Sequence, residues 1–155
     1  MPFYFCHYDS PIGRLDLIAN QQALVAVLSE TTTLLQDAIF DPEQPILQQT
    51  KIQLDEYFLG QRREFDLALE PQGTDFQKRA WQALRQIPYG ETRSYLQQAQ
   101  MLAQPKAVRA VGAANGKNPI LIIIPCHRVI GSNGKLVGFS SGIEKKQFLL
   151  NLEQA

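Results

Sequence analysis

The residues best suited to chemistry in this sequence are Cys126 and His127, adjacent in the segment Pro125-Cys-His-Arg-Val129. A cysteine reacts as its thiolate, and neighbouring basic or cationic groups lower the pKa of the thiol. His127 and Arg128 supply such groups, a pattern typical of a nucleophile beside its base. A lone cysteine after an apolar run is more commonly an inert buried thiol. Since successive side chains of a strand point to opposite faces, the pair acts together only if the backbone turns there or a water bridges the gap.

The other cysteine and histidine residues point away from metal and disulfide chemistry. The chain has two cysteines and two histidines, without CxxC or HxxxH spacing. Two cysteines are too few for a disulfide framework, and a structural zinc site takes four ligands. We therefore expect no metal and no cofactor. We also expect Cys6 and His7 to lie in an N-terminal strand and to have no catalytic role.

The net charge of the chain is zero, but the charges are unevenly distributed. Residues 1–75 carry four Lys/Arg and twelve Asp/Glu, whereas residues 76–155 carry eleven Lys/Arg and three Asp/Glu. A basic half suits a polyanionic partner such as nucleic acid. The alternative is that each half is simply solvated, and charge alone does not decide between the two.

Length and composition indicate a globular protein of 155 residues, either one compact domain or a small N-terminal layer joined to a larger C-terminal one. No apolar run is long enough to span a membrane, and the N-terminus lacks the layout of a signal peptide. We therefore expect a cytoplasmic protein with no membrane partner.

The first half of the chain predicts strands followed by a helix. Residues 14–19 alternate in part, and residues 24–28 are a short apolar run. Residues 46–59 have apolar side chains at helical spacing and end before a glycine. The segment 70–74 is a turn-rich boundary. It divides the chain into an N-terminal α/β domain, 1–72, and a C-terminal domain, 73–155.

The second half predicts helices. The first begins at Asp75, and Ser94 opens a second helix, through Met101, with a capping-box pattern. A third helix follows over 106–114 with Pro105 at its start, so that the last two form a helix-turn-helix. On the third helix a stripe of small residues would allow close approach to a grooved surface or a tight contact in the core: Ala107, Ala110 and Ala114.

Residues 120–124 are five consecutive apolar residues, which predict a buried strand that ends at Pro125. Cys126 would then lie just beyond the end of this buried segment. A last helix is expected over 143–152, with Phe148, Leu149 and Leu152 facing the core. Together these elements predict an α+β fold: a small strand-and-helix domain, then a helical domain with a helix-turn-helix and an active-site cysteine loop.

The segment Ile124-Pro-Cys-His-Arg-Val129 resembles the active-site signature of the methylated-DNA-protein-cysteine methyltransferases, also called 6-O-alkylguanine-DNA alkyltransferases. The resemblance extends over nearly the whole chain. It is close from Phe76 onward and looser before it. Further motifs fall in the family's order and spacing: Ser10-Pro-Ile-Gly13, Phe76-Gln77, Trp81, Ile87-Pro-Tyr-Gly-Glu-Thr92, Ser94-Tyr95, Arg109-Ala-Val-Gly112, Asn118-Pro119, Gly142, Leu149-Leu150 and Glu153.

The resemblance implies DNA repair by direct reversal. The acceptor nucleophile would be Cys126, which takes an alkyl group from the 6-oxygen of guanine in duplex DNA and keeps it, so each molecule acts once. His127 would draw the thiol proton through a water, and Glu153 would orient its imidazole, as in hydrolase triads. Asn118 would shape the active-site turn. Tyr95 would meet the flipped guanine and its phosphate and supply a proton as the base leaves.

The resemblance also implies how DNA is held. The target atom is out of reach inside a base stack, so the base must be flipped out, and Arg109 would fill the gap it leaves. The third helix would enter the minor groove, which gives the alanine stripe a function. Partners would be double-stranded DNA containing alkylated guanine, bound by a monomer. The remaining expected DNA contacts are Lys106, Ala107, Ala110, Arg128 and Ser140.

The sequence departs from the family pattern where Ser141 replaces a glycine and Phe139 replaces a tyrosine found in some members. Zinc occurs in some relatives but is not carried over to a chain with two histidines. Four of the site residues also have plainer interpretations. Glu153 could be a surface carboxylate, Tyr95 a helix-face aromatic, Arg128 a structural ion-pair partner and Arg109 a solvated charge.

Two other classes of function compete with this one. Cys, His and an acid would also suit a thiol hydrolase or peptidase, which would need an oxyanion hole and would leave the basic helix-turn-helix unexplained. The third class is a DNA-binding regulator or an alkyltransferase-like protein that only senses lesions. Those sensors lack the acceptor cysteine, so Cys126 is the feature that discriminates between them.

Overall fold

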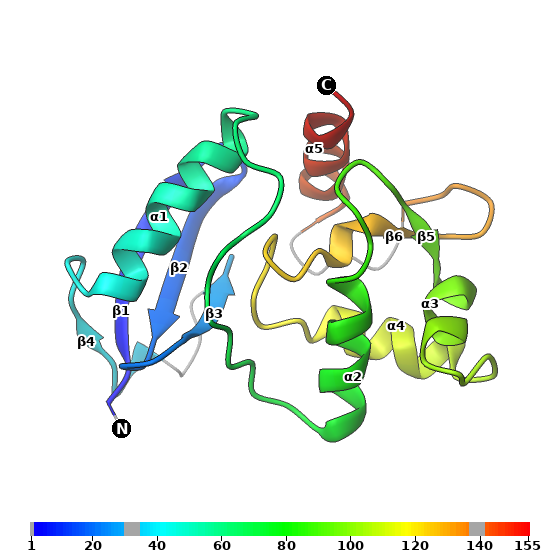
Figure 1. Ribbon diagram of the computed structural model, residues 1–155, viewed down its shortest axis with the longest axis horizontal. Helices are drawn as coiled ribbons and strands as arrows, with labels where there is room; N and C mark the ends of the chain where they lie inside the picture. The colour runs from blue at the N-terminus through cyan, green and yellow to red at the C-terminus, as the bar shows by residue number, and fades with distance from the viewer. Residues whose placement is uncertain (1, 30–34, 137–141) are drawn as a thin grey trace. The chain divides into compact units, whose positions relative to one another are not determined.

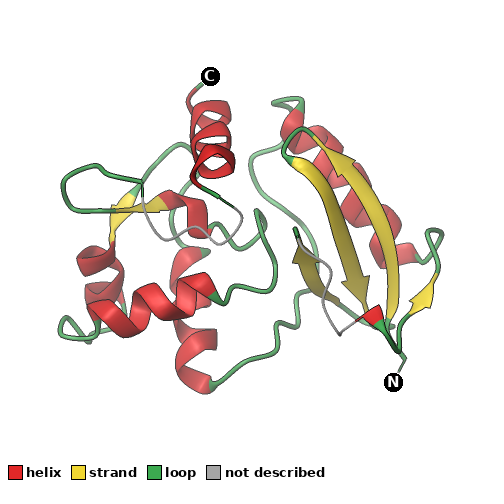
Figure 2. Cartoon of the chain, turned by 180° about the vertical axis from the view of Figure 1, so that it is seen from behind, coloured by secondary structure: helices red, strands yellow, loops and turns green. Residues whose placement is uncertain are grey.

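The computed structural model describes residues 2–29, 35–136 and 142–155. The chain divides into two compact units, 1–72 and 73–155. Strands and helices both occur, which confirms the α+β class (Figures 1 and 2). The elements of the N-terminal unit are β1 (Tyr4–Ser10), β2 (Gly13–Ala19), β3 (Leu24–Leu28), β4 (Ile39–Phe40) and α1 (Pro45–Phe58). Those of the C-terminal unit are α2 (Asp75–Leu84), β5 (Arg93–Ser94), α3 (Tyr95–Met101), α4 (Val108–Gly116), β6 (Val129–Ile130) and α5 (Ile143–Gln154).

The N-terminal unit is a four-stranded sheet in the order β3-β2-β1-β4, with α1 packed along it (Figure 1). The hairpin β1-β2 is antiparallel and closes at Gly13, whose φ of 106° suits a residue without a Cβ. The core between sheet and helix is formed by fully buried side chains such as Leu17, Leu47 and Leu54. Apolar burial on one face of the sheet therefore holds this unit together.

The segment after α1 belongs to the N-terminal unit because its backbone is bonded there. The Gln53 side chain donates to the Asp66 carbonyl at 3.0 Å and accepts from the Asp66 amide at 2.9 Å. Further along, an isolated bridge joins Leu24 to Leu69: the Leu24 N–H donates to the Ala68 carbonyl, and the Glu70 N–H donates to the Leu24 carbonyl. These bonds explain why the division of the chain falls after residue 72.

The C-terminal unit is built around its helices. Both α2 and α3 begin with capping boxes, one from Thr74 and one from Ser94, so the helix starts expected at these positions are confirmed. Trp81 on α2 is fully buried and its indole N–H donates to the Ala114 carbonyl at 2.8 Å. Gln98 on α3 and Asn115 on α4 exchange two amide hydrogen bonds, at 2.9 and 2.7 Å. These contacts set the helix-turn-helix on α2.

The predicted strand over residues 120–124 is wrong, although its predicted burial is right. All five side chains are buried, but the segment is a compact turn in which Ile122 has φ of 72°. The Ile124 N–H bonds back to the Ile120 carbonyl at 3.0 Å. Asn118 binds the backbone at both ends of the turn, replacing the neighbouring strand that a buried ladder would need.

Two helix details also differ from expectation. Helix α4 begins at Val108, because Ala103 takes a left-handed conformation after α3 and residues 104–107 are needed to complete the turn. On α5, Leu149 faces the core as expected, but Phe148 is 41% exposed. Among the described residues, no helix has the length and apolar character needed to cross a membrane.

Candidate active site

Cys126 and His127 lie on a 3₁₀ turn, Cys126–Arg128, which follows the buried 120–124 turn. The Val129 N–H donates to the Cys126 carbonyl and closes it. In this tight turn neighbouring side chains do not alternate as they do along a strand. All three side chains of the turn are buried. The backbone therefore turns where a Cys-His pair needs it to, and residues 129–130 leave as β6, parallel to β5.

Asn118 holds the sulfur and the turn before it. Its side-chain amide donates to Cys126 Sγ at 3.2 Å and to the Ile124 carbonyl at 2.7 Å. Its oxygen accepts from the Ile120 N–H at 3.0 Å. One amide thus satisfies two backbone groups and points an N–H at the sulfur, where it stabilises a thiolate better than a thiol.

Behind the cysteine lies a buried ionic cluster formed by His127, Arg128 and Glu153. His127 Nε2 is 2.6 Å from Glu153 Oε2, and Arg128 donates to both carboxylate oxygens, at 2.8 and 3.1 Å. Arg128 also donates to the Ile87 carbonyl at 2.8 Å, and its guanidinium lies over the Tyr89 ring. The three side chains are 8% exposed or less, so the cluster is desolvated.

This cluster sets the protonation of the imidazole. An ionised carboxylate only accepts hydrogen bonds, so the proton of neutral His127 lies on Nε2, toward Glu153. His127 Nδ1 is buried and has no hydrogen-bond partner among the described residues. It therefore presents a bare lone pair, which is the state in which an imidazole acts as a base.

The pKa shifts agree with that arrangement. Burial lowers the pKa of His127, against the opposing effect of Glu153, so the ring is neutral. Burial alone would raise the pKa of Glu153, but hydrogen bonds from His127 and Arg128 outweigh it and lower the pKa to about 2. Burial raises the pKa of the Cys126 thiol, while the Asn118 hydrogen bond and the charge of Lys146 act in the opposite direction. The resting state is thus a thiol beside a neutral base.

Tyr95 opens α3 at the end of β5 and is half-buried. Burial raises the pKa of its phenol, and the charge of Cys126 raises it further. Tyr95 is therefore a protonated phenol within electrostatic reach of the sulfur. The turn, the base cluster and this phenol bring together all the expected catalytic residues: Cys126, His127, Glu153, Asn118 and Tyr95.

The remaining residues expected to bind DNA differ in their exposure. Lys106, Arg109 and Ala110 are exposed on and before α4, and Ala107 is half-exposed. Ala114, by contrast, is buried under Trp81, so the three alanines do not form one open stripe.

Arg128 is buried and bound to Glu153, which favours the alternative of a structural ion-pair partner over a DNA contact. Ser140 lies outside the described residues, as do Phe139 and Ser141.

The sequence analysis did not single out Lys146, which is buried in the same site. Its ammonium donates to the Val129 carbonyl at 2.6 Å, and it has the opposite charge to a Cys126 thiolate. Its burial could have been predicted from its spacing on the last helix. Lys146, Leu149, Leu150 and Glu153 are three or four residues apart and form the buried face of α5. A lysine in line with core leucines could have been recognised as buried.

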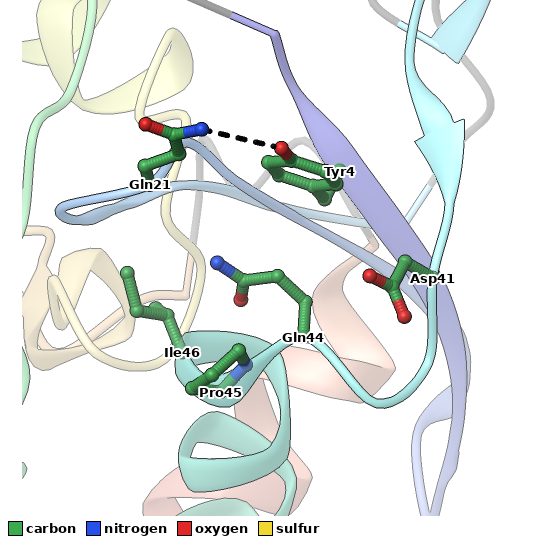
Figure 3. Close-up of a pocket in the computed structure, with 6 residues that line it drawn as sticks. All are labelled: Tyr4, Gln21, Asp41, Gln44, Pro45 and Ile46. Carbon is green, nitrogen blue, oxygen red and sulfur yellow. Dashed lines mark hydrogen bonds between the residues drawn. The ribbon is translucent and has the colours of Figure 1, made fainter.

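The N-terminal unit has a pocket of about 300 Å³ at the start of α1 (Figure 3). It is lined by Tyr4, Gln21, Asp41, Gln44, Pro45 and Ile46. It contains one carboxylate and no nucleophile, so it does not resemble a catalytic site. Within the described parts of the chain, no group of three or more His, Cys, Asp or Glu is arranged to hold a metal ion.

Comparison with known proteins gives one consistent result. Residues 75–155 match the family model described as the DNA binding domain of 6-O-methylguanine DNA methyltransferase, and residues 3–71 match its ribonuclease-like domain. A Methanosarcina acetivorans protein named methylated-DNA–protein-cysteine methyltransferase is 46% identical over 153 residues, covering 97% of each chain. A Mycobacterium bovis protein of the same name is 48% identical, over 96% of this chain and 93% of the relative.

Solved structures extend the likeness to the fold. The crystal structure of a Mycobacterium tuberculosis O6-methylguanine methyltransferase superposes with a TM-score of 0.92 at 45% identity, covering 98% of this chain and 93% of the other. A crystal structure of Mycobacterium tuberculosis OGT in complex with DNA superposes with a TM-score of 0.91 at 46% identity, covering 99% of this chain and 93% of the other.

Proposed function

The chain belongs to the 6-O-methylguanine DNA methyltransferase family and repairs DNA by transferring an alkyl group to a cysteine, and we propose that this cysteine is Cys126. The alternative acceptor, Cys6, lies buried in β1. The observation that carries the proposal is the bare Nδ1 of His127, whose ring is held by Glu153 on the same turn as Cys126, the sulfur of which accepts a hydrogen bond from Asn118. Nucleophile, base and orienting acid thus occur together.

The proposed step is an in-line displacement at the alkyl carbon. The thiol proton passes to His127 Nδ1 through a water, and the imidazolium that forms is stabilised by Glu153. The Cys126 thiolate attacks the alkyl carbon, a sulfur–carbon bond forms, and the bond from that carbon to the 6-oxygen of guanine breaks. Tyr95 supplies a proton to the departing base. The thioether product has no good leaving group, so each molecule reacts once.

Arg128 acts in this scheme as a positioning residue. Its two bonds to Glu153 keep the acid ionised and fixed, and its bond to the Ile87 carbonyl ties the cluster to the segment after α2. A buried carboxylate with a pKa of about 2 stays charged at neutral pH and holds the proton of His127 on Nε2.

The chain binds DNA, and we assign the contact to the C-terminal unit, residues 73–155. Lys106 and Arg109 are exposed cations on and before α4, with Ala110 beside Arg109 and solvent-facing, so a phosphate backbone and a groove could approach closely. We propose that α4 enters the minor groove of duplex DNA containing alkylated guanine, and that Arg109 fills the gap left by the flipped base. The monomeric state and the cytoplasmic location expected from the sequence stay predictions.

The test of the proposed acceptor is a mass spectrum after incubation with duplex DNA containing 6-O-methylguanine. We expect one added methyl group per molecule, on the peptide that contains Cys126, and no further product beyond one equivalent. Methylation of Cys6, or repeated turnover as in a thiol hydrolase, would contradict the assignment.

The role of Arg109 is tested by comparing two substrates. Arg109→Ala should slow repair of a paired lesion much more than reaction with free 6-O-methylguanine, because the free base has no stack to leave. Ala113→Ser, on the same exposed side of α4, is a matched control. Equal losses on both substrates would reject the proposed role in base flipping.

A further inference from the structure

Lys146 is the most deeply buried lysine side chain among the described residues, at 1% exposure, and the proposed reaction does not yet use it. A buried ammonium is costly unless a partner compensates it. The Val129 carbonyl, 2.6 Å away, supplies one hydrogen bond. A neutral carbonyl compensates only part of the cost of burying a full charge, so the surrounding charges matter.

The position of the Val129 carbonyl relates Lys146 to the nucleophile. The Val129 N–H closes the turn by donating to the Cys126 carbonyl, and the Val129 C=O accepts from Lys146. Val129 also begins β6, which pairs with β5 in the register Arg93↔Val129. Residue 95 follows directly after β5. Lys146 therefore anchors α5 to the backbone element that connects Cys126 with Tyr95.

The groups that act on the sulfur, or follow it in the chain, come from different elements. Tyr95 begins α3, Asn118 follows α4, His127 is the next residue, and Lys146 comes from α5. His127 contacts Glu153, which is in turn paired with Arg128, so the opposite charges of these two residues largely cancel. Among the groups that act on Cys126, Lys146 is the cation. Burial lowers the pKa of Lys146, and the charge of Cys126 raises it, so each group favours the charged form of the other.

We propose that Lys146 is a positioning residue of the transfer reaction, which clamps the Val129 carbonyl beside the Cys126 turn and supplies the positive charge that stabilises the Cys126 thiolate. This inference rests on the proposed function, in which Cys126 is the nucleophile. Proton transfer to His127 creates a thiolate and an imidazolium inside a desolvated site. A fixed ammonium favours the thiolate without having to be recruited from solvent, because it is already held in place before the reaction starts.

The test is the pH profile of Cys126 alkylation by iodoacetamide in the absence of DNA, read on the Cys126 peptide by mass spectrometry. Lys146→Met removes the charge and the donor, Lys146→Gln removes the charge but keeps an N–H donor, and Lys146→Arg keeps both. The control is Lys145→Met, the preceding residue on the same helix. Circular dichroism and thermal unfolding establish that each variant is folded.

We expect Lys146→Met and Lys146→Gln to move the midpoint of the profile upward by about one pH unit or more, with labelling at neutral pH roughly tenfold slower. Lys146→Arg and Lys145→Met should stay near the parent profile. Single-turnover methyl transfer from duplex DNA should slow in the same order. If Lys146→Met does not fold, Lys146→Gln decides the outcome, because it can still bind the Val129 carbonyl.

An unchanged midpoint in a folded, uncharged variant would overturn the proposal. Slower methyl transfer with an unchanged pH profile would also overturn it, because Lys146 would then serve the fold alone. Failure of the proposed function has a different signature. In that case the parent protein would carry the methyl group on a peptide other than the one containing Cys126, whatever Lys146 does.

Discussion

Cys6-His7 in the N-terminal unit and Cys126-His127 in the C-terminal unit are the same dipeptide on two different backbones. Along β1 the side chains alternate, so Cys6 is buried and His7 is exposed. On the 3₁₀ turn both Cys126 and His127 are buried. The same two residue types are therefore separated by a strand and brought into one site by a turn.

The comparison extends to the groups around each histidine. His7 lies 2.6 Å from Asp16, with Arg14 at 3.7 Å from the same carboxylate, and the His7 and Arg14 side chains are 38% and 54% exposed. His127 has an acid at the same distance, but its arginine binds that acid twice at closer range and solvent is excluded. In the first trio the acid is buried but the His7 and Arg14 side chains are screened by water, whereas the desolvated trio holds each charge and proton in place. Burial, more than residue type, distinguishes the reactive pair.

The largest expected difference between the two pairs is the effect of replacing the cysteine on methyl transfer. Cys126→Ser should abolish methyl transfer from labelled duplex DNA while leaving DNA affinity intact, because the exposed α4 residues are unchanged. Cys6→Ser should leave transfer close to that of the parent protein. The measurement is label retained on the protein, alongside a binding titration. Residual transfer in the Cys126 variant would remove the basis for the comparison.

The histidines should differ next most strongly. His127→Ala removes the base and should slow single-turnover transfer by roughly 10²- to 10⁴-fold, the usual contribution of a positioned general base. His7→Ala should leave the rate unchanged, since its ring faces away from Cys6 along the strand. Rapid-quench kinetics on duplex DNA measure both. A similar loss in the two variants would mean that the fold, and not proton transfer, had been affected.

Acid should act on the buried cluster through Glu153. Its pKa of about 2 in the folded state lies below the ordinary value of 4.5, so the unfolded chain binds the extra proton between these pH values. The contribution of Glu153 to the free energy of unfolding is therefore present above pH 4.5 and is lost as the pH falls toward 2. This contribution amounts to about 3 kcal/mol. The depressed pKa of His127 has the same sign and begins to act below pH 6.5.

Urea unfolding at several pH values measures this loss. Glu153→Gln should be less stable at neutral pH, since it leaves His127 and Arg128 without their acid, and its free energy of unfolding should vary less between about pH 5 and 2. Glu144→Gln, exposed on the same helix, is the control. An equally steep acid response in Glu153→Gln would show that other groups control it.

The smallest effect concerns the opposite charges of the two halves. If the exposed cations near α4 contact phosphates, the logarithm of DNA affinity should fall with the logarithm of salt concentration by about 0.9 per phosphate neutralised. Lys106→Ala or Lys117→Ala should each reduce that slope by about one unit, equally for all sequences. Arg63→Ala, exposed in the acidic N-terminal unit, should not change it. A flat salt response would mean that the basic half is merely solvated.

The sequence by itself determined which residues are chemically competent and much of the local structure. The Cys-His-Arg segment, the capping box at Ser94 and the charge asymmetry between the two halves are local or additive properties that depend on residue type and short spacing. The buried character of residues 120–124 was also correctly predicted, because apolar side chains leave water whatever backbone they adopt.

Only the tertiary structure decided how these residues meet. Periodicity does not distinguish a buried strand from a buried turn, and the turn at 120–124 depends on Asn118, whose amide takes the place of a neighbouring strand. Likewise, Lys146 and Arg128 carry charges that residue type alone places at the surface. They are buried because partners distant in sequence, the Val129 carbonyl for Lys146 and the Glu153 carboxylate for Arg128, compensate them. Such compensation arises from contacts between helices and turns, which no local pattern encodes.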